Sequence, residues 1–169
     1  MKIFIIGYMG SGKSTFGRKL SRRLNCPFVD MDKVFQLQFN STISNYFEKQ
    51  GEEAFRREEM LLLRQYQNQE NLIISTGGGT PCFYDNMEWM NDNGLTIYLE
   101  MSPAALFSRL KNAKTVRPLL PPTEDFISFI TTHLAKRAPY YSAAQITLNG
   151  LSISIDQVIL EIEKHLAKQ

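Results

Sequence analysis

The feature that most constrains the fold is an apolar run that ends in a glycine-rich turn. Residues 3–6 read IFII, and residues 7–14 fit the pattern G-x-x-x-x-G-K-[ST] at every fixed position. Glycines let the backbone turn tightly and direct successive N–H groups toward a phosphate. The helix that follows adds its positive N-terminal end. The pattern predicts a strand, a phosphate-binding loop and a helix; a coincidental βα turn is the alternative.

The same turn predicts how a nucleoside triphosphate is held. A lysine at the position of Lys13 reaches the outer phosphates, and a hydroxyl at Ser14 is a ligand for Mg²⁺. The predicted nucleotide-binding residues are Gly10, Ser11, Gly12, Lys13, Ser14 and Thr15.

Size and composition narrow the class of protein. A chain of 169 residues favours one domain with a full core, and a net charge of +2 does not suggest a nucleic-acid binder. Two cysteines without metal-site spacing favour a reduced, cytoplasmic protein. We see no signal peptide and no apolar run long enough to cross a bilayer. Because no apolar stripe remains without a partner, we expect a monomer.

Strand-like and helix-like segments alternate along the chain, which predicts a five-stranded parallel sheet with helices on both faces. The predicted strands are residues 2–6, 28–32, 72–75, 95–99 and 144–148. Between the second and third strands lies an aromatic-rich helical insertion, and we expect it to form the floor of a second pocket beside the phosphates.

Two acids close the second strand. If the strand continues through Asp32, the side chains of Asp30 and Asp32 face one site. If a helix starts there, the two diverge and take separate roles; a helix cap and a solvated strand end are the plainer alternative. The third strand ends at Ser75 without the metal-directed aspartate of many P-loop proteins. Asp30 is therefore the predicted second contact for Mg²⁺.

Three consecutive glycines, residues 77–79, follow the third strand directly. Such a run has a backbone-entropy cost, so it indicates close approach of a ligand, with a flexible turn as the alternative. Further along, residues 114–122 place one arginine, Arg117, before a proline-rich turn. We expect this loop to be a lid over the site.

Taken together, these motifs resemble the shikimate kinase family over nearly the whole chain. The residues that carry the resemblance are GYMGSGKST at 7–15, Asp30 and Asp32, GEEAFR at 51–56, TGGG at 76–79, RPLL at 117–120 and RAPYY at 137–141. The resemblance implies a nucleoside-monophosphate-kinase-like fold with strand order 2-3-1-4-5. It also implies ATP-dependent phosphorylation of the 3-hydroxyl of shikimate, a step in chorismate and aromatic amino-acid biosynthesis.

The resemblance also implies roles for individual residues. Shikimate would be bound by Asp32, Arg56, Gly77, Gly78, Gly79 and Arg137, and the pocket lined or braced by Phe47, Phe55 and Glu59. Arg117 would cover the ATP phosphates and act in catalysis with Lys13 and Asp32, while Ser14 and Asp30 would serve Mg²⁺. The chain would form a single domain, residues 1–169, with the phosphate loop at 7–15, a substrate-binding insertion at about 32–61 and a lid at about 111–124.

The adenine contacts are less defined. Arg109 matches a family position that stacks on adenine, and Asn149 and Gly150 are candidates to border the base. Three other functions compete: a gluconate or nucleoside-monophosphate kinase, a non-catalytic nucleotide switch, and an inactive fragment of a larger aromatic-pathway protein. The glycine run and the pair Arg56 and Arg137 favour an acidic polyol as acceptor.

Overall fold

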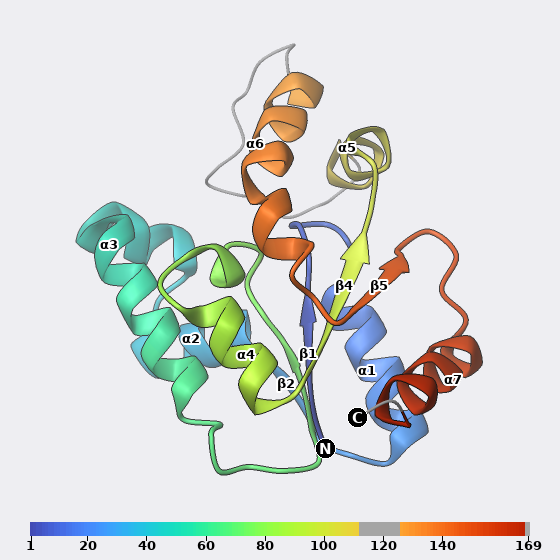
Figure 1. Ribbon diagram of the computed structural model, residues 1–169. Helices are drawn as coiled ribbons and strands as arrows, with labels where there is room; N and C mark the ends of the chain where they lie inside the picture. The colour runs from blue at the N-terminus through green and yellow to red at the C-terminus, as the bar shows by residue number, and fades with distance from the viewer. Residues whose placement is uncertain (112–125, 168–169) are drawn as a thin grey trace.

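The computed structural model describes residues 1–111 and 126–167 (Figure 1). Its centre is a five-stranded parallel sheet with the order β2-β3-β1-β4-β5, as predicted. The strands are β1 (Lys2–Ile6), β2 (Phe28–Asp30), β3 (Leu72–Ser75), β4 (Leu95–Glu100) and β5 (Ile146–Asn149). Among the described residues, no helix is long and apolar enough to span a membrane.

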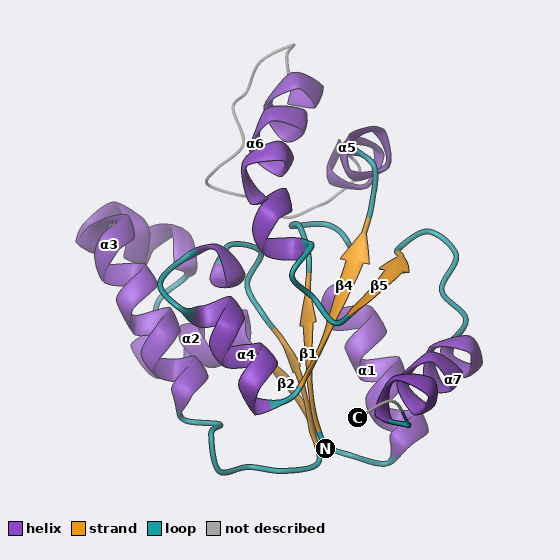
Figure 2. Ribbon diagram, viewed as in Figure 1, coloured by secondary structure: helices purple, strands orange, loops and turns teal. Residues whose placement is uncertain are grey.

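Helices cover both faces of this sheet (Figure 2). They are α1 (Lys13–Leu24), α2 (Met31–Phe39), α3 (Ile43–Arg64), α4 (Asn86–Asn93), α5 (Pro103–Lys111), α6 (Phe126–Tyr141) and α7 (Ile155–Leu166), with a 3₁₀ turn η1 (Thr80–Cys82). Helices α1 and α7 lie on one face, and α2, α3 and α4 lie on the other. Helices α5 and α6 stand beyond the carboxyl ends of the strands.

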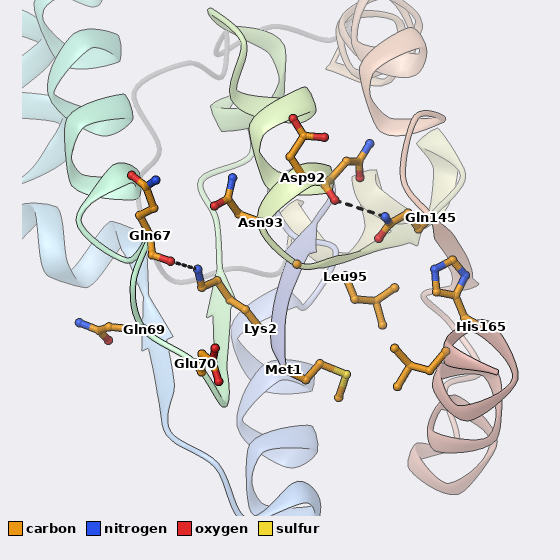
Figure 3. A pocket seen from close by; sticks show the side chains of 13 residues that line it. Met1, Lys2, Gln67, Gln69, Glu70, Asp92, Asn93, Leu95, Gln145 and His165 are labelled. Carbon is orange, nitrogen blue, oxygen red and sulfur yellow. Dashed lines mark hydrogen bonds between the residues drawn. The ribbon is translucent and has the colours of Figure 1, made fainter. Parts of the chain in front are cut away.

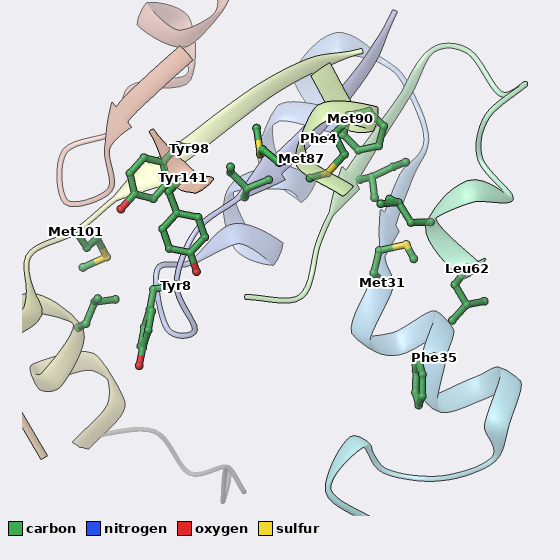
Figure 4. Packing of buried hydrophobic residues seen from close by; sticks show 14 of the residues in the cluster. Phe4, Tyr8, Met31, Phe35, Leu62, Met87, Met90, Tyr98, Met101 and Tyr141 are labelled. Carbon is green, nitrogen blue, oxygen red and sulfur yellow. The ribbon is translucent and has the colours of Figure 1, made fainter. Parts of the chain in front are cut away.

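The central strand, β1, contributes side chains to the hydrophobic cores on both faces of the sheet. Every residue of β1 is buried, and alternate side chains point to opposite faces. Ile3 and Ile5 join the core under α1 and α7, whereas Phe4 and Ile6 join the core under α3, α4 and α6. The second core is the larger and contains most of the buried aromatic rings (Figure 4). Burial on both faces fixes β1 in the middle of the sheet, so the loop after Ile6 emerges at the centre of its carboxyl edge.

The second strand and the helical insertion that follows it differ in detail from what the sequence alone indicates. Strand β2 ends at Asp30 and α2 begins at Met31, so Asp32 lies in the first turn of a helix and the two acids diverge. Within the helical insertion, residues on both sides of Gly51 form one helix, α3, with a kink where Gly51 adopts φ 82° and ψ 168°. Thr42 caps α3 by accepting a hydrogen bond from the Asn45 amide at 3.2 Å.

The end of α6 also differs. Proline usually ends a helix, but α6 continues through Pro139 to Tyr141. The proline removes one donor in the last turn, while the Ala138 carbonyl still accepts from the Ser142 amide at 2.9 Å. The extension places Tyr141, which is fully buried, against the sheet. Arg117 and, apart from Lys111, the predicted lid lie outside the described residues.

Candidate active site

The phosphate loop has the backbone that the motif requires. Gly7, Gly10 and Gly12 have φ angles of 144°, 82° and 94°, which side-chain-bearing residues rarely adopt. Gly12 directly precedes the first turn of α1, so the helix N-terminus opens toward the loop. The Lys13 ammonium donates to the carbonyls of Gly7 at 2.8 Å and Tyr8 at 3.0 Å. The lysine therefore lies across the loop, where phosphates of a nucleotide are bound in P-loop proteins.

Hydroxyls and a carboxylate gather beside this loop. The Ser14 hydroxyl lies 3.5 Å from the Ser75 hydroxyl at the end of β3. Ser75 is the register partner of Asp30, whose carboxylate is 3.8 Å from the Arg18 guanidinium. In residues 1–111 and 126–167, no three His, Cys, Asp or Glu side chains form a metal-binding cluster. Mg²⁺ in a kinase takes only one or two protein ligands besides phosphates and water. The Ser14 hydroxyl and the Asp30 carboxylate are therefore sufficient to bind it.

The glycine turn after β3 is surrounded by side chains of the predicted acceptor site. A Cβ atom on Gly77 would lie 2.4 Å from a Glu59 carboxylate oxygen and 3.2 Å from an Asp32 oxygen. A Cβ atom on Gly79 would lie 2.7 Å from both terminal nitrogens of Arg56. The turn thus lacks side chains because these charged groups pack against its backbone, a reason that sequence analysis did not identify.

Gly78 occupies the middle of the turn and contacts the other side of the site. A Cβ atom there would lie 3.1 Å from the Met9 amide nitrogen of the phosphate loop and 3.5 Å from Arg137 Nη1. The Tyr141 hydroxyl donates to the Gly78 carbonyl at 2.6 Å. The phosphate loop, the glycine turn and α6 are therefore in direct contact.

Arg56 is buried, with 5% of its surface exposed, and its charge is compensated within α3. Its guanidinium donates to Glu52 at 3.1 Å and to Glu59 at 3.0 Å, and it stacks 4.2 Å from the ring centroid of Phe83. Counting the contact from Nε to Glu52, three of its five donor hydrogens are used. Two donors remain, enough for a bidentate contact with a carboxylate.

Glu59 braces Arg56 and the turn at once. Its carboxylate accepts from Arg56 and, at 2.6 Å, from the hydroxyl of Thr80. Burial raises the pKa of the Glu59 carboxyl, while the positive charge of Arg56 and the hydrogen bond from Thr80 act in the opposite direction. The brace role implied for Glu59 fits this geometry. Sequence analysis did not single out Glu52, Thr80 or Phe83, because their relation to Arg56 depends on how α3 and η1 pack together.

Arg137 is buried like Arg56, but one of its terminal nitrogens makes no hydrogen bond within the described part of the chain. It is 6% exposed, and its guanidinium lies 5.5 Å from the ring centroid of Tyr8. Its Nη1 atom is buried and has no hydrogen-bond partner among the described residues. Leaving a buried charged donor unpaired costs free energy, so this atom is suited to an anionic partner.

A cavity of about 390 Å³ adjoins the other side of the phosphate loop. Arg109 lines it and donates to the carbonyls of Ser11 at 3.0 Å and Gly150 at 3.2 Å. Gly150 also lines the cavity, whereas Asn149 is not among its lining residues and instead accepts from the Leu151 amide at 3.0 Å. The position fits a nucleotide base next to α1.

A cavity of about 480 Å³ lies at the opposite edge of the sheet (Figure 3). It is lined by Met1, Lys2 and Leu95 at the amino ends of β1 and β4, and Lys2 donates to the Gln67 carbonyl at 2.8 Å. Ligands of open α/β sheets bind at the carboxyl ends of the strands. None of the predicted site residues lines this cavity, so we do not assign the activity to it.

A phosphate loop joined through a glycine turn to two buried arginines defines a P-loop kinase that acts on a small anionic molecule. A model of the family described as shikimate kinase matches residues 9–167. A shikimate kinase from Bacteroides thetaiotaomicron is 46% identical over 152 residues, which cover 89% of this chain and 87% of that protein. The chain belongs to the shikimate kinase family, as the sequence motifs predicted.

Solved structures agree with this assignment. The crystal structure of shikimate kinase from Bacteroides thetaiotaomicron superposes with a TM-score of 0.90 at 42% identity, covering 99% of this chain and 98% of that one. A shikimate kinase from Acinetobacter baumannii, solved in complex with shikimate, gives a TM-score of 0.86 at 29% identity, covering 99% and 93%. The predicted fold and enzyme class are confirmed.

The packing at Gly79 yields a prediction. Gly79→Ala should displace Arg56 and raise KM for shikimate by about tenfold or more, the effect of losing one charge-assisted hydrogen bond. Overpacking should also lower stability by about 1–3 kcal/mol. Steady-state kinetics and thermal unfolding check both.

Gly51→Ala is the matched control. It places alanine at a φ of 82°, which is less favourable than the φ of −93° at Gly79, but its Cβ would meet no atom within 4 Å. We expect it to lower the melting temperature and leave KM for shikimate unchanged. Equal shikimate KM values for Gly79→Ala and the native protein would contradict the role of the glycine turn.

Proposed function

We propose that the chain transfers the γ-phosphoryl group of ATP to the 3-hydroxyl of shikimate, giving shikimate 3-phosphate and ADP, with Mg²⁺ bound to the nucleotide. Family membership supports the reaction. The main structural support for shikimate as the phosphoryl acceptor is a pair of buried arginines, Arg56 and Arg137. They pack on the glycine turn beside the phosphate loop.

On the donor side, the loop amides and the α1 N-terminus bind the phosphates, with Lys13 supplying positive charge. Ser14 would hold Mg²⁺ directly and Asp30 would assist through water; the ion would neutralise charge on the transferred group. The contact between the Ser14 and Ser75 hydroxyls supports this placement, because it brings the ends of β3 and α1 together. From the sequence motif, we assign Arg117 to the ATP phosphates as well.

On the acceptor side, Arg137 and the two remaining donors of Arg56 bind the carboxylate of shikimate. Asp32, next to Gly77 at the start of α2, accepts hydrogen bonds from substrate hydroxyls and orients or deprotonates the 3-hydroxyl. Because phosphoryl transfer needs little covalent help, positioning and charge neutralisation carry the catalysis. The glycine turn sets the spacing between the bound ATP phosphates and the bound shikimate.

We also propose that the enzyme is a single domain that acts as a cytoplasmic monomer without binding nucleic acid. The net charge of +2 supports the last point, and the free cysteines Cys26 and Cys82 are consistent with a reducing compartment. The adenine base is assigned to the cavity lined by Arg109 and Gly150.

The assignment is tested by ADP release with shikimate, gluconate and AMP compared side by side in the presence of Mg²⁺. We expect ATP to be consumed only with shikimate, since the two arginines match a carboxylate on a polyol ring. EDTA should abolish the reaction. Turnover with AMP equal to that with shikimate, or no turnover with shikimate, would contradict the proposal.

The role of Asp32 is tested by Asp32→Asn, which keeps the size of the side chain and removes its charge. A positioned acid or base contributes about 10²- to 10⁴-fold to a rate, so we expect kcat to fall by at least tenfold with an unchanged melting temperature. Asp92→Asn, in the cavity at the opposite sheet edge, is the matched control and should keep native kcat. Full activity of Asp32→Asn would rule out both roles assigned to Asp32.

A further inference from the structure

A large buried side chain projects from the phosphate loop toward α6. Tyr8, the second residue of the loop motif, is 1% exposed. Its hydroxyl lies 2.9 Å from Nδ1 of His133, which is 125 residues away in the sequence, and the two rings meet edge to face at 5.5 Å. Tyr8 and Tyr141 belong to the same buried cluster (Figure 4). Phosphate loops bind ligands through their backbone, so phosphate binding does not explain this side chain.

The same ring contacts the acceptor arginine. His133 and Arg137 are four residues apart on α6 and therefore project from the same side of the helix. The Arg137 guanidinium lies 5.5 Å from the Tyr8 ring centroid, while the Tyr8 hydroxyl reaches His133. Tyr8 thus contacts two successive turns of α6. Its carbonyl also accepts from Lys13, so one residue of the loop touches both the phosphate-binding lysine and the acceptor arginine.

The surroundings keep both partners of this hydrogen bond uncharged. Burial lowers the pKa of His133 to about 4, assisted by the positive charges of Arg137, Lys136 and Arg56 and opposed by Glu52. Burial also raises the pKa of the Tyr8 hydroxyl. At neutral pH the imidazole is therefore neutral, and the imidazole tautomer decides which of the two groups donates.

We propose that Tyr8 and His133 are positioning residues. Their hydrogen bond fixes the Tyr8 ring beneath Arg137, and the ring in turn holds Arg137 at a fixed position relative to the phosphate loop. This inference rests on the proposed function, because it assigns Arg137 to the shikimate carboxylate. The ring holds the guanidinium by a cation–π contact and leaves Nη1 directed to the acceptor. Without the hydrogen bond, the ring and the arginine above it gain freedom.

The test compares Tyr8→Phe, His133→Leu and the double variant with the native enzyme. Tyr8→Phe keeps the ring and removes only the hydroxyl. The loss of one hydrogen bond should raise KM for shikimate by about three- to tenfold, with KM for ATP within about twofold of native. The double variant should match either single variant, because both remove the same contact. His133→Asn places an amide oxygen near the position of Nδ1 and should restore a KM close to native.

Several results would overturn the inference. They are a native shikimate KM in Tyr8→Phe and His133→Leu, an equal rise in both KM values, effects that add in the double variant, or no rescue by His133→Asn. Thermal unfolding of each variant shows whether a change in KM accompanies loss of fold. A native protein that does not phosphorylate shikimate would refute the proposed function and this inference together. An active native enzyme with unaffected variants would refute this inference alone.

Discussion

The site depends on the close packing of charged side chains against a backbone turn that has no side chains of its own. Residues 77–79 leave β3 between two arginines and two acids, and the Cβ atoms of alanine at Gly77 and Gly79 would lie within 3 Å of Glu59 and Arg56, respectively. Since β3 is the neighbour of β1, the turn also lies beside the phosphate loop. The distance between the phosphate donor and the acceptor pocket therefore follows from strand pairing and from the absence of three side chains.

Burial gives the two arginines different properties. Arg56 is compensated by Glu52 and Glu59 and fixed by the ring of Phe83, so it is a preorganised part of the pocket wall. Arg137 has aromatic contact with Tyr8 but a buried nitrogen without a partner in the described part of the chain. In the function proposed above, an incoming carboxylate would meet one arginine that is already held in place and another whose charge it would neutralise.

Much of this arrangement could be predicted from the sequence. The buried run 3–6 and the motif at 7–14 determine the central strand and the phosphate loop, and the alternation of segments determines the sheet. Local patterns did not resolve where β2 ends, because a strand and a helix start compete at Asp30 and Asp32. They also gave Tyr8 little weight and did not single out His133, because the partners of these side chains lie more than 100 residues apart in the chain.

The central claim is that Arg56 and Arg137 bind the carboxylate of the acceptor. Calorimetric titration of the native protein with shikimate and with its methyl ester tests this directly, because the ester keeps the ring and hydroxyls but removes the charge. Loss of charge-assisted hydrogen bonds worth about 1.5–3 kcal/mol each predicts that the ester binds at least about tenfold more weakly. Equal affinities for shikimate and its ester would contradict the account.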